Sequence, residues 1–186
     1  MTSKVLVPLG QMVSRARSAV DRNSNTRQIE LIPMPEAPTR VTLALAGLLK
    51  GLKAIGVGEV LATRAVVRVG LDSIPALRRK AIDVLAGAEA PLSLKAIART
   101  LRYPPTTVWR ALEDLEAHRV VRRSSPEKEA LWSLTRWTRR RYVAIHTVPE
   151  KSPHAQEEER ACAGADISGK AKAAASAKTE RRRADR

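Results

Sequence analysis

Residues 93–123 read SLKAIARTLRYPPTTVWRALEDLEAHRVVRR, and this stretch decides the fold. Its apolar residues recur at helical spacing twice, once before and once after the prolines at 104 and 105. A proline lacks the amide donor that a continuing helix needs, but it suits the first turn of a new helix. The pattern therefore predicts helices at 94–101 and 105–117, with Ser93 as the N-cap of the first.

The flanking residues predict the elements that complete this unit. Two helices of this length are unstable alone, so a third element must cover their shared apolar face. Residues 74–85 have apolar side chains at helical spacing and supply it. After the second helix, Val120 and Val121 and the alternation at 130–135 predict a two-stranded hairpin with a polar, basic tip. This order of elements predicts a winged helix-turn-helix over residues 74–147.

Residues 93–123 resemble the winged helix-turn-helix of bacterial IclR-type and MarR-type transcription regulators. The pattern in those families is A-x-x-x-G-L-P-x-[ST]-T-V-x-R-x-L-x-x-L, followed by a short turn into G-[LV]-V. The matching residues here are Ala98, Pro104, Thr106, Thr107, Val108, Arg110, Leu112, Leu115, Val120 and Val121. Arg102 and Arg119 replace glycines of the pattern, which predicts left-handed backbone at a non-glycine residue in the turn. The resemblance implies double-stranded DNA as the partner.

In such a module the second helix enters the major groove and the wing lies over an adjacent groove or the backbone. Thr106, Thr107, Trp109 and Arg110 are expected to face outward, with Arg110 donating to guanine. Basic side chains of the wing and of the run after it are expected to contact phosphates. The candidate DNA-binding residues are Tyr103, Thr106, Thr107, Trp109, Arg110, Arg122, Arg123, Lys128, Arg139, Arg140 and Arg141.

Simpler interpretations stand beside these. Arg110 could pair with Glu113 or Asp114 on its own helix. Trp109 could pack on a neighbouring domain or a second copy of the chain, and the wing cations could be an ordinary solvated turn. Trp132 is expected in the core of the module.

Charge favours a nucleic-acid partner. The chain carries a net charge of +15, and residues 75–147 hold fifteen Lys or Arg against seven Asp or Glu. Folding needs no such excess, whereas an anionic partner is attracted by it. There is no run of eighteen apolar residues, so we expect no membrane span and a cytoplasmic location. The lone Cys162 excludes an internal disulfide.

The sequence predicts no enzyme, no catalytic residue, no cofactor and no metal site. The glycines at 47, 51, 56 and 58 lack the Lys-Ser or Lys-Thr end of a phosphate-binding loop. The three histidines, His118, His146 and His154, are scattered along the chain, which supports neither a metal site nor a catalytic triad.

The remaining residues divide into three segments. Residues 1–38 are expected to be mostly irregular, and residues 148–186 are expected to be a disordered charged tail. Residues 39–55 and 59–71 are predicted to form a helical hairpin within 39–73, serving either as a homodimer element or as a lid within the chain. The predicted fold is mainly α with a small β-hairpin, in which a winged helix-turn-helix follows a helical hairpin between disordered termini.

Three functions fit these predictions. The first is a DNA-binding transcription regulator that reads double-stranded DNA with residues 105–117 and a basic wing. The second is a detached or degenerate C-terminal DNA-binding module of an AAA+ type ATPase or replication initiator, because a helical pair precedes the winged helix there too. The third is a winged helix used as a protein–protein adaptor.

Overall fold

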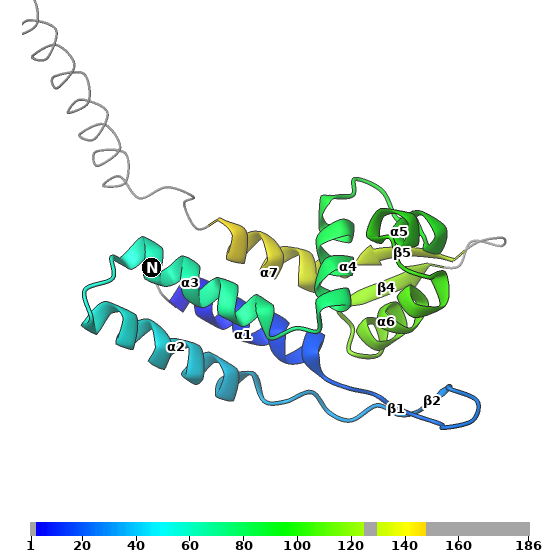
Figure 1. The fold of residues 1–186 in the computed structure, drawn as a ribbon, viewed down its shortest axis with the longest axis horizontal. Coiled ribbons are helices and arrows are strands. Elements are labelled where there is room, and N and C mark those ends of the chain that lie inside the picture. The colour runs from blue at the N-terminus through cyan, green and yellow to red at the C-terminus, as the bar shows by residue number, and fades with distance from the viewer. Residues whose placement is uncertain (1–2, 125–129, 148–186) are drawn as a thin grey trace, which may run out of the picture. The chain divides into compact units, whose positions relative to one another are not determined.

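The structure, a computed structural model, describes residues 3–124 and 130–147. Within residues 1–148, which form one unit, seven described helices accompany two small antiparallel sheets (Figure 1). The helices are α1 (Ser3–Arg17), α2 (Pro38–Ala54), α3 (Glu59–Asp72), α4 (Ala76–Gly87), α5 (Leu94–Leu101), α6 (Pro105–Ala117) and α7 (Arg136–His146). The strands are β1 (Asp21–Arg22), β2 (Ile29–Leu31), β3 (Leu92–Ser93), β4 (Val121–Ser124) and β5 (Leu131–Leu134).

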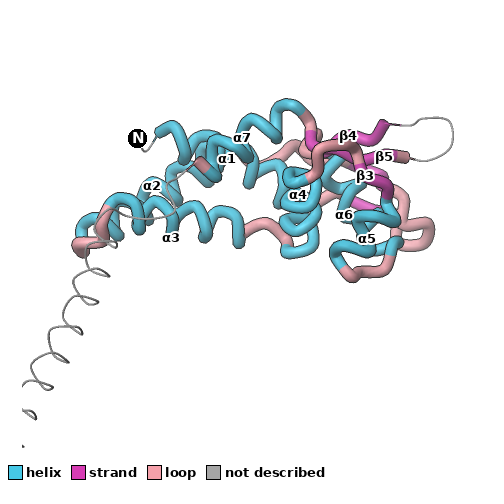
Figure 2. Tube along the Cα trace, turned by 90° about the horizontal axis from the view of Figure 1, so that it is seen from above, coloured by secondary structure: helices cyan, strands magenta, loops and turns pink. Residues whose placement is uncertain are grey.

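The winged helix-turn-helix comprises α4, α5 and α6 with the sheet β3-β5-β4 (Figure 2). Strand β5 is central: Leu134 pairs with Val121 of β4, and Trp132 pairs with Leu92 of β3. Trp132 is fully buried, as predicted, in a core that also takes side chains from all three helices. The sheet therefore holds the second helix of the motif, α6, through its buried face.

The three predicted helices of this module are present, although the first begins at Ala76 and ends at Gly87 and does not span residues 74–85. Helices α5 and α6 have the predicted bounds, and the hydroxyl of Ser93 accepts a hydrogen bond from the amide of Ala96 at 3.3 Å. Arg102 and Arg119 have φ of 57° and 58°, so arginines do occupy left-handed backbone at both turns. The predicted hairpin gains a third strand, β3, which with two residues is too short to show an alternating pattern.

The prediction that residues 1–38 are mostly irregular is wrong for Ser3–Arg17, which form α1. Leu9, Met12 and Val13 of α1 are fully buried, and α1 packs on α2, α3 and α7. A Cβ on Gly10 would meet the side chain of Thr42, so this glycine lets α1 and α2 approach closely. Pro8 lies inside the helix, where it removes a backbone hydrogen bond and obscures the helical signal.

Helix α7 directly follows the wing and was not predicted as a helix. Thr135 caps it by accepting a hydrogen bond from the amide of Thr138 at 3.2 Å. Two guanidinium groups lie over the ring of its Trp137, that of Arg141 at 3.8 Å and that of Arg15 of α1 at 4.2 Å from the ring centre. Helix α7 therefore joins the winged helix to α1 (Figure 1).

The predicted tail, residues 148–186, lies outside the described residues. Of the helices in the described part of the chain, none has the length and apolar character needed to span a membrane.

Candidate nucleic-acid interface

Helix α6 presents a polar outer face at its N-terminal end. Thr106, Thr107 and Arg110 are exposed there, while Val108 and Leu112 on the opposite face are fully buried. Burial of one stripe fixes the rotation of the helix, so the three polar side chains project away from the core. Two hydroxyls and one guanidinium are thus displayed together on the first two turns.

The acidic residues of α6 are bound to arginines of other elements. Asp114 accepts hydrogen bonds from Arg22 Nη2 at 2.5 Å and from Arg78 Nη2 at 2.7 Å, and Glu113 accepts one from Arg22 Nη1 at 3.0 Å. The side chains of Arg22, Arg78 and Asp114 are 17, 12 and 15% exposed. The negative charge on this helix is therefore neutralised inside the protein.

This arrangement excludes an ion pair between Arg110 and the acids of its own helix. The acids three and four residues further along α6 pair with Arg22 and Arg78, not with Arg110. Within residues 3–124 and 130–147, the guanidinium of Arg110 makes no hydrogen bond or ion pair. Its five donors are available to an outside partner.

Arg22 remains charged at this position. Burial by itself lowers the pKa of the Arg22 guanidinium, but hydrogen bonds to Asp114 and Glu113 and their charges outweigh burial, and the net effect raises the pKa above its ordinary value. The arginine of this network therefore stays charged throughout the usual pH range.

Trp109 packs within the chain. Its ring centre lies 5.5 Å from that of Trp132 with the two ring planes at 88°, an edge-to-face pair, and the guanidinium of Arg123 lies 5.5 Å from the centre of the Trp109 ring. It is half-buried, so the wing and α6 are joined through this indole. This contact with its own hairpin differs from the neighbouring domain or second copy that the sequence suggested.

The wing displays two exposed arginines. Arg122 donates from Nε to the hydroxyl of Ser133 at 3.0 Å, and Arg123 lies 3.9 Å from a carboxylate oxygen of Glu116. Lys128, predicted at the tip of the wing, lies outside the described residues. Tyr103, in the turn before α6, is 38% exposed, and the ammonium of Lys80 lies 5.6 Å from its ring centre.

The basic run Arg139, Arg140 and Arg141 lies on α7. Arg139 donates to the carbonyls of Leu85, Ala86 and Ala88 at the end of α4, at 3.4 to 3.5 Å. Arg141 donates to Gln11 of α1 at 2.8 Å, and burial and the charges of Arg15 and Arg140 lower its pKa. Two of the three arginines, Arg139 and Arg141, therefore connect helices, and both Arg139 and Arg140 are exposed.

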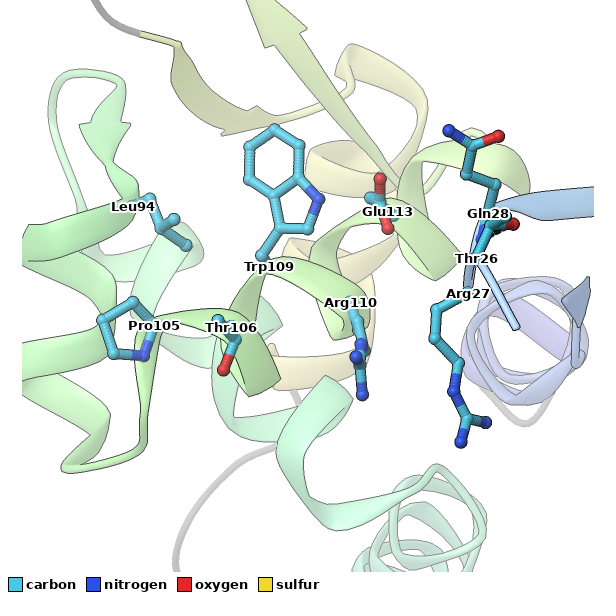
Figure 3. Close-up of a pocket in the computed structure, with 9 residues that line it drawn as sticks. All are labelled: Thr26, Arg27, Gln28, Leu94, Pro105, Thr106, Trp109, Arg110 and Glu113. Atoms are coloured by element: carbon cyan, nitrogen blue, oxygen red, sulfur yellow. Dashed lines mark hydrogen bonds between the residues drawn. The ribbon is translucent and has the colours of Figure 1, made fainter. Parts of the chain in front are cut away.

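A ribbon formed by β1 and β2 lies against α6 and was not predicted. Its turn, residues 23–28, borders an open groove of about 390 Å³ whose other side is α6. Arg27 and Arg110 both line the groove, and in Figure 3 their side chains point the same way while Trp109 points the opposite way. The sequence showed this segment only as polar residues typical of a turn. Its contact with α6 could not be predicted, because Arg22 and Asp114 are 92 residues apart.

No metal centre is evident in the described part of the chain: residues 3–124 and 130–147 contain no group of three or more His, Cys, Asp or Glu able to hold an ion.

The winged helix-turn-helix is similar to known proteins in both sequence and structure. Residues 80–125 match the family described as the IclR helix-turn-helix domain. MepR, a transcription regulator of the Staphylococcus aureus multidrug efflux pump MepA, is 18% identical with a TM-score of 0.41, over 55% of this chain and 84% of that chain. RV1404 from Mycobacterium tuberculosis is 18% identical with a TM-score of 0.40, over 73% and 96%.

A third structure, reduced AbfR bound to DNA, is 20% identical with a TM-score of 0.37, over 70% of this chain and 99% of that chain. No curated protein matches the sequence. The family match begins within α4 and covers α5, α6 and the start of the wing, which confirms the resemblance seen in residues 93–123.

Proposed function

We propose that this chain is a DNA-binding transcription regulator that reads double-stranded DNA with α6 and contacts the backbone with its wing. The observation that carries the proposal is the guanidinium of Arg110, which has no partner among residues 3–124 and 130–147 and lies one turn after two exposed threonines on the helix that follows the turn. Helices in this position of a winged helix-turn-helix meet base edges with their N-terminal residues.

The exposed candidate side chains of the turn, α6 and β4 have the following roles in the proposal. Arg110 donates its fork to O6 and N7 of a guanine in the major groove, and Thr106 and Thr107 contact a phosphate or a thymine methyl. Arg122 and Arg123 contact backbone phosphates from the wing, and Tyr103 donates to a phosphate near the turn. Arg139 and Arg141 are left out because both hold helices together.

A titration with salt tests the proposal. The full chain is mixed with labelled duplexes, one random and one pool enriched by selection, and anisotropy gives the affinity at each salt concentration. Log affinity should fall with log salt at about 0.9 per phosphate neutralised, and the enriched pool should bind more tightly. Affinity that is flat with salt and near background would exclude DNA binding.

We also propose a homodimer through residues 39–73. Beyond Arg40, the outer face of α2 is exposed and apolar, where it presents Leu43, Ala44, Gly47, Leu48 and Gly51. Its inner face already packs on α1, so the outer face is left for a second copy. A two-fold dimer would place two α6 helices on a site with matching symmetry.

Sedimentation measures this dimer. Leu48→Glu places a charge in the middle of the face and should shift the chain to monomer at concentrations where the unchanged protein is dimeric. Val143→Glu, on an exposed position of α7, should leave the mass unchanged. A monomeric unchanged protein would refute the dimer without affecting DNA binding by a single copy.

The ATPase-module and adaptor alternatives gain no support from the family match or the three structures. A regulator of this kind works in the cytoplasm, which is the location we propose.

A further inference from the structure

We propose that the turn of the N-terminal ribbon, residues 23–28, is a second DNA-contacting element, with Arg27 bound to a backbone phosphate beside the groove that α6 enters. This rests on the proposed function of α6. It adds a contact from a segment outside the winged helix-turn-helix. A network of ion pairs and hydrogen bonds within the protein holds this turn in position beside α6.

Arg22 holds the ribbon on α6. Its Nη1 donates to Glu113 at 3.0 Å and to the carbonyl of Arg27 at 3.0 Å, and its Nη2 donates to Asp114 and to the carbonyl of Arg110 at 3.3 Å. One guanidinium therefore bonds the turn and the helix at the same time. The position of Arg27 relative to Arg110 is set by a single, largely buried side chain.

The turn is also ordered internally. The carboxamide oxygen of Asn23 accepts from the amides of Asn25 at 2.8 Å and Thr26 at 2.9 Å, and the amide of Arg27 donates to the carbonyl of Asn23 at 3.0 Å. Arg27 has a φ of 61°, which places it in left-handed backbone. A preformed turn loses little conformational entropy when it binds.

The charge of the turn suits an anion. Residues 23–28 contain one cation and no acid, and Arg27 faces the same groove as Arg110 and Thr106 (Figure 3). The ribbon also covers Glu113 and Asp114, two charges that would otherwise repel phosphates. Both effects raise the positive potential beside the N-terminal half of α6.

Geometry favours a phosphate over a base as the ligand of Arg27. A major groove about 12 Å wide admits one helix or one two-stranded ribbon, and α6 fills that space. A ribbon packed beside α6 must then lie at the edge of the groove, where the backbone runs. Arg27 should therefore strengthen binding to every sequence and read none.

The test replaces Arg27 by asparagine, which tolerates left-handed backbone, and by lysine, which keeps the charge. Affinities are measured for the enriched and random duplexes over a salt series. Loss of one phosphate contact lowers the salt slope by about 0.9, which is roughly 8-fold in affinity at 0.1 M salt and roughly 4-fold at 0.2 M. Arg27→Asn should show this loss equally on both duplexes, and Arg27→Lys should restore most of it.

The control is Lys4→Ala, which removes one exposed cation on α1, outside both α6 and residues 39–73, and it should leave the slope unchanged. A duplex with one neutral methylphosphonate at the contacted phosphate should bind the unchanged protein and Arg27→Asn equally well.

The outcomes separate the two proposals. If the unchanged protein binds DNA with a steep slope and Arg27→Asn behaves like Lys4→Ala, the ribbon contact is refuted and the role of α6 stands. Tighter binding by Arg27→Asn would show that the ribbon shields α6, which also overturns the inference. If the unchanged protein shows no salt-dependent affinity, the proposed function fails and the ribbon contact fails with it.

Discussion

Replacing Asp114 by alanine should destabilise the protein strongly, because this carboxylate joins three elements. It accepts hydrogen bonds from Arg22 at 2.5 Å and from Arg78 at 2.7 Å while only 15% exposed. Hydrogen bonds to charged groups contribute roughly 1.5–3 kcal/mol each. Both arginines keep other acceptors and some solvent contact, so we expect a total loss of about 2–3 kcal/mol in the free energy of unfolding.

Urea unfolding followed by tryptophan fluorescence measures this loss. In a chain of this size each kcal/mol corresponds to roughly 2–4 °C in Tm, so the thermal midpoint should fall by about 4–12 °C. Arg78 also donates to the carbonyl of Ser18 at 2.6 Å, so the segment between α1 and β1 should loosen. Faster amide exchange in residues 18–31 should accompany the drop in stability.

Asp72 provides the matched control. It also faces two arginines, Arg79 and Arg68, but its side chain is 53% exposed. Exposed pairs contribute little, so Asp72→Ala should cost less than about 1 kcal/mol. If Asp114→Ala costs no more than Asp72→Ala, the reasoning from burial is refuted.

Three further predictions follow from single positions. Arg102→Gly removes a side chain from left-handed backbone and should raise the free energy of unfolding by about 0.5–1 kcal/mol, whereas Arg99→Gly inside α5 should lower it by about 1 kcal/mol. Urea midpoints that move in the same direction in the two variants would contradict this. Gly10→Ala places a methyl against Thr42 and should cost about 1–3 kcal/mol by the same assay, and a neutral effect would show that α1 and α2 separate freely. The pKa of Tyr142 is raised to about 12, first by burial and then by the charge of a nearby carboxylate and a hydrogen bond to it. The protonated phenol therefore contributes fully to the free energy of unfolding below pH 10.0, and this contribution is lost as the pH rises toward about 12. Ultraviolet titration of the folded protein should show a late phenol step that Tyr142→Phe removes, and a titration complete near pH 10.0 would oppose it.

The winged helix could be predicted because its signals are local. Two prolines separate two helical stripes, Ser93 caps the first, and Arg102 stands where the turn needs left-handed backbone. Each of these features acts through neighbours within a few residues. A sequence pattern registers such short-range constraints directly.

The contacts beyond the winged helix could not be predicted, because their partners are distant in sequence. Helix α1 carries an internal proline, and its buried face becomes apparent only against α2, α3 and α7. The basic run in α7 suggested a surface for phosphates, but Arg139 and Arg141 bond to α4 and α1. Among the candidate site residues, the outward position of Arg110 was predicted. Its lack of an ion pair with the acids of α6 depends on Arg22, which pairs with both acids and which no local pattern connects to α6.

The most direct test of sequence reading by α6 is to select duplexes from a random pool with the unchanged protein and with Arg110→Ala. We expect the unchanged protein to enrich a discrete site, and Arg110→Ala to lose preference at one guanine position with a loss of about 1–3 kcal/mol on the enriched site. Arg123→Ala should weaken enriched and random duplexes by the same factor. If Arg110→Ala also weakens both equally and enriches the same site, α6 does not read bases through this arginine.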